Sequence, residues 1–382
     1  MAADQRRPGR RHTARTHPVV PPIYQTTTFE LDDTAYADIQ GTGGLHETWY
    51  SRFGNPTVDA AAAEVARLHR ASRSLMTSSG MAAIATTLVT LLRSGDTLVA
   101  GRQVYGDTDD LLTRDLPGLG VEVVRVDTFD TSGWRRAIAE HRPAVVYGET
   151  LSNPQLRLLP VPAVAEAAHQ AGARMVVDNT FATPWCVRPL GLGADVVVES
   201  ATKFLAGHSD VVAGAVTTDD VELHEQVQRR VITFGGCLDA HAAFLVWRGL
   251  RTFEIRLATA CRTAAAVAAA MADTPGVSHV RYPGRPDHPD AGAVAEAVMP
   301  GARGAMVSLV LDGGDERALA VLRRLRVAVE ATSLGGVETL ASLPFNSSHF
   351  NMTGEQRLEA GIPPGLLRLS VGLEGEEALV AD

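Results

Sequence analysis

Short runs of apolar, often β-branched residues alternate with longer amphipathic stretches over the first two thirds of the chain. The runs at 97–100 and 144–149 are largely apolar, which is typical of strands that are buried on both faces. The stretches at 59–69 and 160–171 instead repeat their apolar residues at helical spacing. This alternation predicts an α/β fold with a mostly parallel, seven-stranded sheet covered by helices. The other five strands are expected at 75–77, 121–126, 174–178, 195–199 and 212–217.

The pattern changes near residue 240. Residues 241–271 form a long Ala- and Leu-rich stretch with helical periodicity, broken or bent once at most, and Pro275 ends it. Two further strands, at 306–311 and 366–371, and a helix at 316–325 predict a smaller C-terminal α+β domain. We therefore divide the chain into an N-terminal arm and loop (1–50), a large domain (51–240) and a small domain (241–382).

The N-terminal part is too rich in proline for a helix. Residues 16–29 are expected to form an extended arm, and residues 41–46 a Gly-rich loop. Residues 1–15 are Arg-rich without an apolar core, which is unlike a secretory signal. An extended arm of this kind can cross to a neighbouring subunit.

Composition excludes several classes of function. The net charge of −9 argues against a nucleic-acid partner, which would require a basic face. We find no apolar run long enough to predict a membrane span. The three cysteines are far apart and form no CxxC pair, so the sequence predicts neither a zinc site nor another metal site, and it fits a reducing, cytoplasmic location.

Only one of the 35 basic residues counted as Lys or Arg is a lysine, Lys203. Arginine supplies surface charge equally well, but only lysine supplies a neutral primary amine, which forms Schiff bases with carbonyl compounds. Lys203 follows the strand predicted at 195–199, and open α/β sheets bind ligands at the carboxyl ends of their strands. An ordinary surface lysine is the alternative; the polar residues around it favour a site.

Polar side chains also follow other predicted strands at the points where those strands end. They are Tyr105 after 97–100, Glu149 and Asn153 after 144–149, and Asp178 and Thr180 after 174–178. Each one alone is explained as a helix cap or a turn residue. Because they converge on the sheet edge that carries Lys203, a catalytic site explains them better as a group. The turn at Ser79 and Gly80 precedes a helix and offers free backbone N–H groups to an anion, although such a turn is often only a helix cap.

The segment 200–210, Ser-Ala-Thr-Lys-Phe-Leu-Ala-Gly-His-Ser-Asp, resembles the cofactor-lysine motif of the Cys/Met-metabolism enzymes that use pyridoxal phosphate. That family includes cystathionine γ-synthases, cystathionine γ-lyases, methionine γ-lyases and homoserine-ester sulfhydrylases. The resemblance extends from about Thr16 to Glu374 and includes the segment 50–57, Tyr-Ser-Arg-Phe-Gly-Asn-Pro-Thr. It implies a fold-type I, PLP-dependent transferase-like fold, the cofactor pyridoxal 5′-phosphate, an amino-acid substrate and a cytoplasmic homotetramer built as a dimer of dimers.

The resemblance also implies residue roles. Lys203 would form the Schiff base with the cofactor and shuttle protons, Asp178 would support the pyridine nitrogen, and Tyr105 would stack on the ring and act as an acid. The implied cofactor contacts are Tyr50, Arg52, Ser79, Gly80, Met81, Tyr105, Asn153, Asp178, Thr180, Ser200, Thr202 and Lys203. Of these, Tyr50 and Arg52 would reach the partner subunit's cofactor phosphate. The implied substrate contacts are Ser333, Arg368, Asn153 and Tyr105, with Arg368 as the clamp for the α-carboxylate.

Three positions depart from the patterns of the family's better-known members. Asp110 stands where the γ-synthases and γ-lyases commonly have an arginine, Thr332 where the cystathionine lyases have a glutamate, and Asp107 where methionine lyases often have a cysteine. Asp110 would repel the distal carboxylate of a substrate that faces it, which argues against O-succinylhomoserine as the substrate. Asp109 or Asp110 could instead replace the missing glutamate as the partner of a distal ammonium.

We therefore hypothesise a PLP-dependent carbon–sulfur lyase that performs γ-elimination on L-methionine or L-cystathionine and releases 2-oxobutyrate, ammonia and a thiol. One alternative is γ-replacement by a transferase of the cystathionine γ-synthase or O-acylhomoserine sulfhydrylase type, which shares the same catalytic residues. Another is a cofactor-free binding or scaffold protein on a decayed enzyme fold, against which the intact Lys203, Asp178, Tyr105 and Arg368 count.

Overall fold

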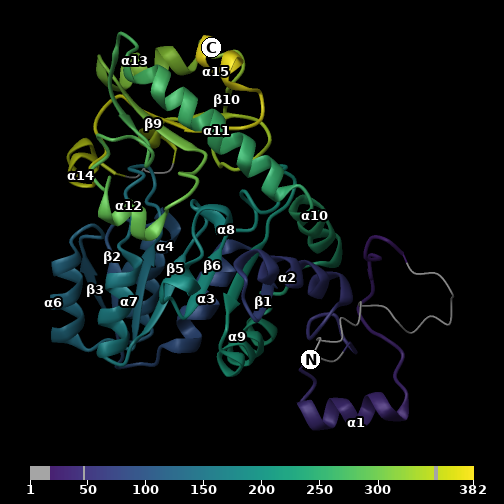
Figure 1. Cartoon of the computed structure of the whole chain (residues 1–382). Coiled ribbons are helices and arrows are strands. Elements are labelled where there is room, and N and C mark those ends of the chain that lie inside the picture. Colours follow the sequence, from purple (N-terminus) through teal and green to yellow (C-terminus); the bar gives the residue numbers. More distant parts are fainter. Residues whose placement is uncertain (1–17, 46–47, 348–351) are drawn as a thin grey trace.

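The structure is a computed structural model that describes residues 18–45, 48–347 and 352–382, with two β-sheets that lie one above the other in Figure 1. Within these residues the larger sheet has seven strands in the order β1-β7-β6-β5-β4-β2-β3. The strands are β1 (Arg73–Thr77), β2 (Thr97–Gly101), β3 (Glu122–Val126), β4 (Val145–Glu149), β5 (Arg174–Asp178), β6 (Val196–Glu199) and β7 (Gly214–Thr218). Neighbours from β6 to β3 pair in parallel, whereas β7 is antiparallel to both β1 and β6. The predicted mostly parallel sheet is confirmed.

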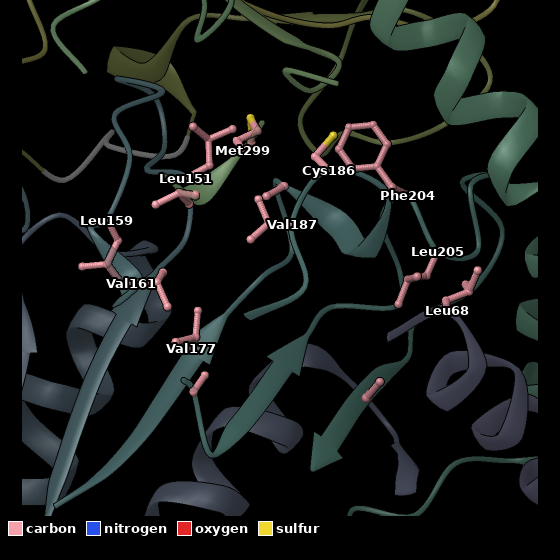
Figure 2. Packing of buried hydrophobic residues seen from close by; sticks show 14 of the residues in the cluster. Leu68, Leu151, Leu159, Val161, Val177, Cys186, Val187, Phe204, Leu205 and Met299 are labelled. Atoms are coloured by element: carbon pink, nitrogen blue, oxygen red, sulfur yellow. The ribbon is translucent and has the colours of Figure 1, made fainter. Parts of the chain in front are cut away.

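Helices cover both faces of this sheet. One face packs against α2 (Pro56–His69), α6 (Thr131–His141) and α7 (Val161–Gln170), and Figure 2 shows part of that core. The other face packs against α3 (Gly80–Leu91), α9 (Val221–Phe234) and a helical segment made of α4 (Gly106–Asp110), the π-helical turn η1 (Leu111–Asp115) and α5 (Leu116–Gly118). Successive side chains of a strand point to opposite faces, so Val176 joins the second core and Val177 the first.

The smaller sheet lies in the C-terminal part of the chain. In the described residues its order is β10-β11-β12-β9-β8, with β10 parallel to β11 and the other pairs antiparallel. These strands are β8 (Val277–Arg281), β9 (Met306–Leu311), β10 (Val329–Glu330), β11 (Leu340–Ser342) and β12 (Leu366–Ser370). Its core includes residues of α11 (Phe253–Ala272) and α13 (Gly314–Leu322), which matches the predicted α+β architecture, while the domain boundaries given above stay predictions. The shorter helical segments are α8 (Thr183–Cys186), η2 (Pro189–Leu192), α12 (Ala293–Val298), η3 (Pro344–Asn346), α14 (Gly354–Glu359) and α15 (Glu376–Ala381).

The long helical stretch after residue 240 is two helices, α10 (Ala240–Leu250) and α11, separated at Arg251 and Thr252. One break agrees with the expectation that the stretch is broken or bent once at most. By length and composition alone α11 is apolar enough to cross a membrane, so the statement that no apolar run is long enough was wrong for this helix. Its apolar residues have another explanation, because Leu257, Ala264 and Val267 are buried in the protein core.

The N-terminal segment contains a helix that the sequence analysis missed. Residues 33–42 form α1 (Asp33–Thr42), which starts where the Asp32 carboxylate accepts a hydrogen bond from the Ala35 N–H and ends at Gly43 in the left-handed conformation. The loop expected at 41–46 therefore begins two residues later than predicted, and His46 lies outside the described residues. Figure 1 shows α1 apart from both sheets, and none of its residues is buried.

Candidate active site

A cavity of about 450 Å³ lies where the carboxyl ends of β4, β5 and β6 meet loops from the smaller sheet. It brings together every predicted site residue except Tyr50 and Arg52. Those that line it are Ser79, Gly80, Met81, Tyr105, Asn153, Asp178, Thr180, Ser200, Thr202, Lys203, Ser333 and Arg368. The convergence of strand ends that the sequence predicted therefore exists, whereas the roles of the residues remain predictions.

Lys203 lies on the short loop that follows β6. Its amine is 2.6 Å from the hydroxyl of Ser333, which comes from the loop between β10 and β11. The loop is fixed locally, because the Gly207 N–H donates to the Lys203 carbonyl oxygen at 2.8 Å. Burial, and then the positive charge of Arg368, lower the pKa of the Lys203 amine. Both effects increase the share of the neutral amine, the form that Schiff-base chemistry requires.

Arg368 extends from β12 and is buried. Its guanidinium donates to the side-chain oxygen of Asn153 and to the carbonyl oxygen of Ser333, both at 3.0 Å. In the described part of the chain no acidic residue forms an ion pair with it, and burial lowers its pKa to about 10. It is therefore still a cation at neutral pH, held in place by neutral acceptors. A buried guanidinium without an anion is a suitable site for a carboxylate.

Asp178 ends β5 and is buried at the base of the cavity. Its carboxylate accepts a hydrogen bond from the Thr180 N–H at 2.8 Å, and the Thr180 hydroxyl accepts one from the Ser200 N–H at 2.9 Å. These contacts tie the loop after β5 to the loop that carries Lys203. Burial raises the pKa of Asp178 to about 6. A nearby cation, such as a protonated pyridine nitrogen, would stabilise the ionised carboxylate.

The turn between β1 and α3 forms the part of the cavity wall beside Ser200. The Ser79 hydroxyl accepts from the Ala82 N–H and the Ser79 carbonyl from the Ala83 N–H, so in the described structure the N–H groups of Gly80 and Met81 have no partner of this kind. A Cβ atom at Gly80 would lie 2.7 Å from the Cβ of Ser200, so only glycine fits there. The result is a close-fitting helix N-terminus that suits an anion such as a phosphate.

Tyr105 lies at the rim of the cavity and is 43% exposed. Its hydroxyl donates to the Asp107 carboxylate at 2.8 Å, and its backbone N–H donates to Glu149 at 2.5 Å. Glu149 is a buried lining residue to which the sequence analysis gave no role. Burial, together with the Asp107 carboxylate, raises the pKa of the Tyr105 phenol to about 12, so this phenol is protonated at neutral pH.

The two other acids of this segment do not face the cavity. Asp109 forms an ion pair with Arg125, and Asp110 forms one with Arg114, each at 2.6 Å. Neither acid lines the cavity. The expectation that one of them would face the distal end of the substrate was therefore wrong, because the helix that starts at Gly106 turns both carboxylates toward arginines outside the cavity.

Tyr50 and Arg52 lie near a different hollow, together with Tyr24 and Asp239. The Arg52 guanidinium donates to the carbonyl oxygen of Ile232 at 3.2 Å and lies over the ring of Tyr50. Within one chain these residues do not reach the cavity. This separation fits the prediction that they serve a neighbouring subunit, which stays a prediction.

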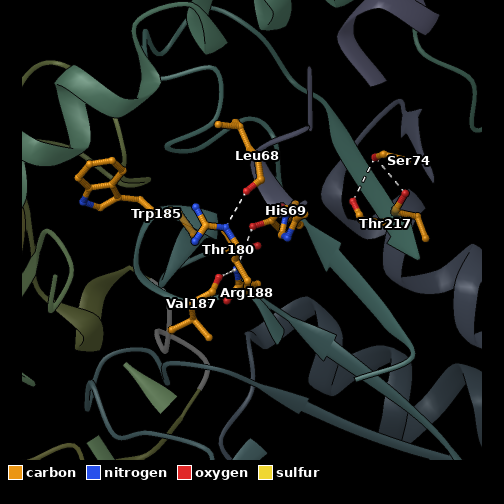
Figure 3. Close-up of polar contacts among 12 residues, drawn as sticks. Leu68, His69, Ser74, Thr180, Trp185, Val187, Arg188 and Thr217 are labelled. Atoms are coloured by element: carbon orange, nitrogen blue, oxygen red, sulfur yellow. Dashed lines mark hydrogen bonds and ion pairs between the residues drawn. The ribbon is translucent and has the colours of Figure 1, made fainter. Parts of the chain in front are cut away.

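A buried polar cluster, which no pattern in the sequence indicates, connects the end of α2 to the ends of β5 and β6. His69, the last residue of α2, lies 2.6 Å from the carboxylate of Glu199, which ends β6 (Figure 3). The same carboxylate accepts a hydrogen bond from the side chain of Asn179 at 3.3 Å, and Asn179 follows Asp178 directly. Arg188 donates to the carbonyl oxygen of Leu68 and so holds the end of α2.

This arrangement of Lys203, Asp178 and the helix N-terminus at Gly80 fits the class that the sequence resemblance implies, the fold-type I enzymes that use pyridoxal phosphate. Comparison with known proteins narrows this class. The family model described as Cys/Met metabolism PLP-dependent enzyme matches residues 4–382, and the chain belongs to that family. The predicted family and the predicted cofactor, pyridoxal 5′-phosphate, are thereby confirmed.

Relatives with several activities resemble the chain to a similar degree. It is 40% identical over 369 residues to an L-methionine γ-lyase of Fusobacterium nucleatum subsp. nucleatum, covering 94% of this chain and 91% of the relative. A solved structure of a cystathionine γ-lyase from Micromonospora echinospora is 40% identical, with a TM-score of 0.89 over 98% of this chain and 95% of that one. A cystathionine γ-synthase from Xanthomonas oryzae pv. oryzae is 39% identical, with a TM-score of 0.88 over 95% and 91%.

Proposed function

We propose that this enzyme is a carbon–sulfur lyase that catalyses γ-elimination on L-methionine or L-cystathionine. With methionine, the Cγ–S bond breaks, one water is consumed, and the products are methanethiol, 2-oxobutyrate and ammonia. The observation that carries the proposal is the charge of the cavity. Among its described lining residues the cationic side chains are Lys203 and Arg368, so this chain supplies no further cation there to bind the distal carboxylate of an acylated homoserine such as O-succinylhomoserine. The names of the relatives, which include γ-lyases for both substrates, agree with this reading.

The residues present fit the cofactor. When bound, pyridoxal phosphate supplies a ring that accepts the electron pair left behind when a proton leaves the substrate's Cα. We infer that the phosphate binds to the backbone N–H groups of Gly80 and Met81, beside Ser79, and to the side chains of Ser200 and Thr202. Asp178, with Thr180 holding its carboxylate, would support the positive charge on the ring nitrogen. Asn153 would donate a hydrogen bond to the phenolic oxygen.

Arg368 and Lys203 would act on the amino-acid part of the substrate. Arg368 is fixed by Asn153 and Ser333, so its free N–H groups can clamp the α-carboxylate without a conformational search. Because burial and Arg368 lower the pKa of Lys203, its neutral amine can accept the Cα proton. The hydroxyl of Ser333, 2.6 Å away, would orient the amine while it carries protons between neighbouring carbons.

Tyr105 would complete the reaction at the γ-position. Its phenol carries its proton at neutral pH, and burial together with the Asp107 carboxylate raises its pKa further, to about 12. The proton is therefore present when the Cγ–S bond breaks and can pass to the departing sulfur, which leaves more readily as a thiol than as a thiolate. Its position at the exposed rim of the cavity suits contact with the substituent rather than with the α-carbon.

We further infer a cytoplasmic homotetramer in which subunits complete one another's sites. Val19 is 98% exposed in the single chain, Val20 and Ile23 are also exposed, and the N-terminal segment extends away from both sheets (Figure 1). Apolar residues exposed on such a segment favour burial against another chain. Tyr50 and Arg52 follow this segment and would reach the partner's phosphate.

The test is a product assay on the purified, cofactor-loaded enzyme. L-Methionine and L-cystathionine are supplied separately, and 2-oxobutyrate and the released thiol are measured, with Lys203→Ala as the inactive control. Keto acid from either substrate supports γ-elimination and identifies the preferred leaving group. The resemblance to a cystathionine γ-synthase makes γ-replacement the second candidate. No keto acid from either substrate, together with a thioether product from O-acetyl- or O-succinylhomoserine and a thiol, would overturn the proposal in favour of replacement.

A further inference from the structure

The hydroxyl of Tyr105 and the carboxylate of Asp107 form a hydrogen bond of 2.8 Å at the rim of the cavity. Tyr105 lines the cavity, so the Asp107 charge lies one hydrogen bond away from an atom that a substrate can touch. The backbone of Tyr105 is fixed from the other side by Glu149, to which its N–H donates. The position of the carboxylate is thus set by the site and not by a free surface loop.

Three carboxylates lie in this segment, and they differ in whether an arginine is paired with them. Asp109 is paired with Arg125, which also donates to the carbonyl oxygens of Gly101 and Arg102 and is therefore held away from the cavity. Asp110 is paired with an arginine one turn further along its own helix. In the part of the chain that the structure describes, Asp107 forms no ion pair, and its carboxylate accepts a hydrogen bond from the neutral phenol of Tyr105. It is therefore the acid of this segment whose charge acts at the rim of the cavity.

The other lining residues of this chain offset little of this charge. Thr332, Ser347 and Val212 also line the cavity and are uncharged, and the amine of Lys203 contacts the hydroxyl of Ser333. Arg368 is directed to Asn153 and to Ser333 and is committed to the α-carboxylate in the proposed function. A γ-substituent that extends to Tyr105 thus meets a negative field with little compensation.

We propose that Asp107 is a specificity-determining residue, which disfavours substrates whose γ-substituent ends in a carboxylate and favours those whose substituent is neutral or carries an ammonium group. This inference rests on the proposed function, because it assumes that the γ-substituent lies beside Tyr105. It names the substrate class of the same site: thioethers rather than dicarboxylic acyl esters of homoserine. Through its hydrogen bond, the same carboxylate also holds the phenol in the protonated form.

A purely structural role for Asp107 is the competing explanation. It lies in the first turn of α4, where an acidic residue stabilises a helix through the helix dipole. Asp109 lies in the same turn and is the matched control for that effect, since its carboxylate is paired outside the cavity. A structural role would change the melting temperature in both variants and leave the choice of substrate unchanged.

The experiment compares Asp107→Asn with Asp109→Asn and Asp110→Asn in the cofactor-loaded enzyme. Asparagine keeps an acceptor for the Tyr105 hydroxyl and removes only the charge. The measured quantity is the ratio of kcat/KM for O-succinyl-L-homoserine to that for L-methionine, both followed as 2-oxobutyrate. We expect Asp107→Asn to raise this ratio about three- to tenfold at low salt, the effect of one charge acting over several ångströms of partly solvated space. The gain should shrink at about 0.5 M salt because the rim is exposed. The two control variants should keep the ratio within about twofold.

A binding measurement separates this proposal from the proposed function. The absorbance change of the bound cofactor on addition of each amino acid reports its Kd whether or not turnover follows. If the wild-type enzyme releases no keto acid from methionine, the proposed function fails, and the ratio of the two Kd values still tests Asp107. The inference is overturned if Asp107→Asn leaves both ratios unchanged, or if Asp109→Asn changes them equally.

Discussion

The amine of Lys203 and the hydroxyl of Ser333 meet at 2.6 Å, and this contact joins a loop of the larger sheet to a loop of the smaller one. The backbone of Ser333 has a φ of 86°, in the left-handed region that non-glycine residues rarely adopt. Its carbonyl oxygen also accepts a hydrogen bond from Arg368. One residue in a strained conformation thus contacts both cations of the cavity, and strain of this kind is retained where the surrounding structure depends on it.

Two substitutions of Ser333 distinguish the effect of its hydroxyl from the effect of its strained backbone. Ser333→Ala and Ser333→Gly both remove the hydroxyl that orients Lys203, and both should lower kcat/KM about tenfold, which corresponds to the loss of roughly one hydrogen bond. Glycine adopts the left-handed conformation without strain, so Ser333→Gly should melt about 1 °C above Ser333→Ala. Steady-state kinetics and thermal melts measure the two effects. If the glycine variant regained wild-type kcat/KM, the backbone and not the hydroxyl would be the functional element.

The single lysine allows a chemical test that does not depend on activity. Borohydride reduction of the cofactor-loaded protein should fix the cofactor on one peptide, the one that contains Lys203, because no other lysine exists in the chain. Mass spectrometry of a proteolytic digest locates the label. Lys203→Ala should carry no label at this peptide and should show no turnover, while label on the N-terminal peptide reports non-specific reaction of the α-amino group. A wild-type protein labelled only at its N-terminus would contradict the assignment.

The sequence predicted the parts of the site that depend on strand ends. Asp178 and Lys203 each follow a short buried strand, and parallel pairing brings such positions together whatever the details of packing. The sequence did not predict that Asp109 and Asp110 point away from the cavity. The direction of Asp109 depends on the helical register that begins at Gly106, and a shift of one residue turns a side chain by about 100° around a helix.

Contacts between residues far apart in the chain could not be predicted from the sequence either. His69 and Glu199 are 130 positions apart, and neither belongs to a pattern that predicts their contact. Each directly follows an apolar residue, Leu68 or Val198, so periodicity alone assigns the two elements to the core and leaves the polar side chains unexplained. α1 was missed for a different reason: it is short and buries none of its residues, so it lacks the apolar stripe from which helices are predicted.

The pKa of Asp178 predicts how the stability of the cofactor-free protein depends on pH. Burial raises this pKa from its ordinary value of 3.8 to about 6, so the folded protein binds the proton more tightly than the unfolded chain does. The stability that the neutral acid contributes is complete below pH 3.8 and is lost as the pH rises through about 6. Asp178→Asn should therefore melt a few degrees above the wild type at pH 7.5, with roughly a third of that difference at pH 4.5, in the absence of cofactor.

In the cofactor-loaded protein the order of the melting temperatures should be reversed, with the wild type above Asp178→Asn. Without the carboxylate that supports the ring nitrogen, Asp178→Asn should bind pyridoxal phosphate more weakly and gain less stability from it.

Asp130→Asn is the matched control for the pH dependence without cofactor, because Asp130 is an exposed helix cap whose hydrogen bonds lower its pKa, and the asparagine can still cap the helix. Its effect on melting should not change between pH 5 and 8. Equal pH profiles for wild type and Asp178→Asn without cofactor would contradict this account.

The contact between His69 and Glu199 predicts a strong energetic coupling behind the site. Both side chains are buried, and in the described structure the carboxylate receives its hydrogen bonds from His69 and Asn179 while the Nδ1 atom of His69 has no partner. Removal of one member leaves the other buried without its partner, so His69→Leu should cost about 3 kcal/mol in the free energy of unfolding. The double variant His69→Leu/Glu199→Leu should cost clearly less than the sum of the two single variants, because an apolar pair of similar volume leaves no buried charge.

A second His–acid pair in the same chain serves as the control for this cycle. His169 lies 3.0 Å from Asp195, but its side chain is half exposed, so His169→Ala should cost no more than about 1 kcal/mol. Denaturant unfolding of the cofactor-free protein at a fixed concentration measures all the variants, and the fluorescence of added pyridoxal phosphate reports whether the loop from Asp178 to Thr180 still forms. Since Asn179 connects that loop to Glu199, His69→Leu should also weaken cofactor binding, whereas His169→Ala should not. Equal losses for His69→Leu and His169→Ala would mean that burial adds nothing to this contact, and the cluster would then have no part in holding the loop that carries Asp178.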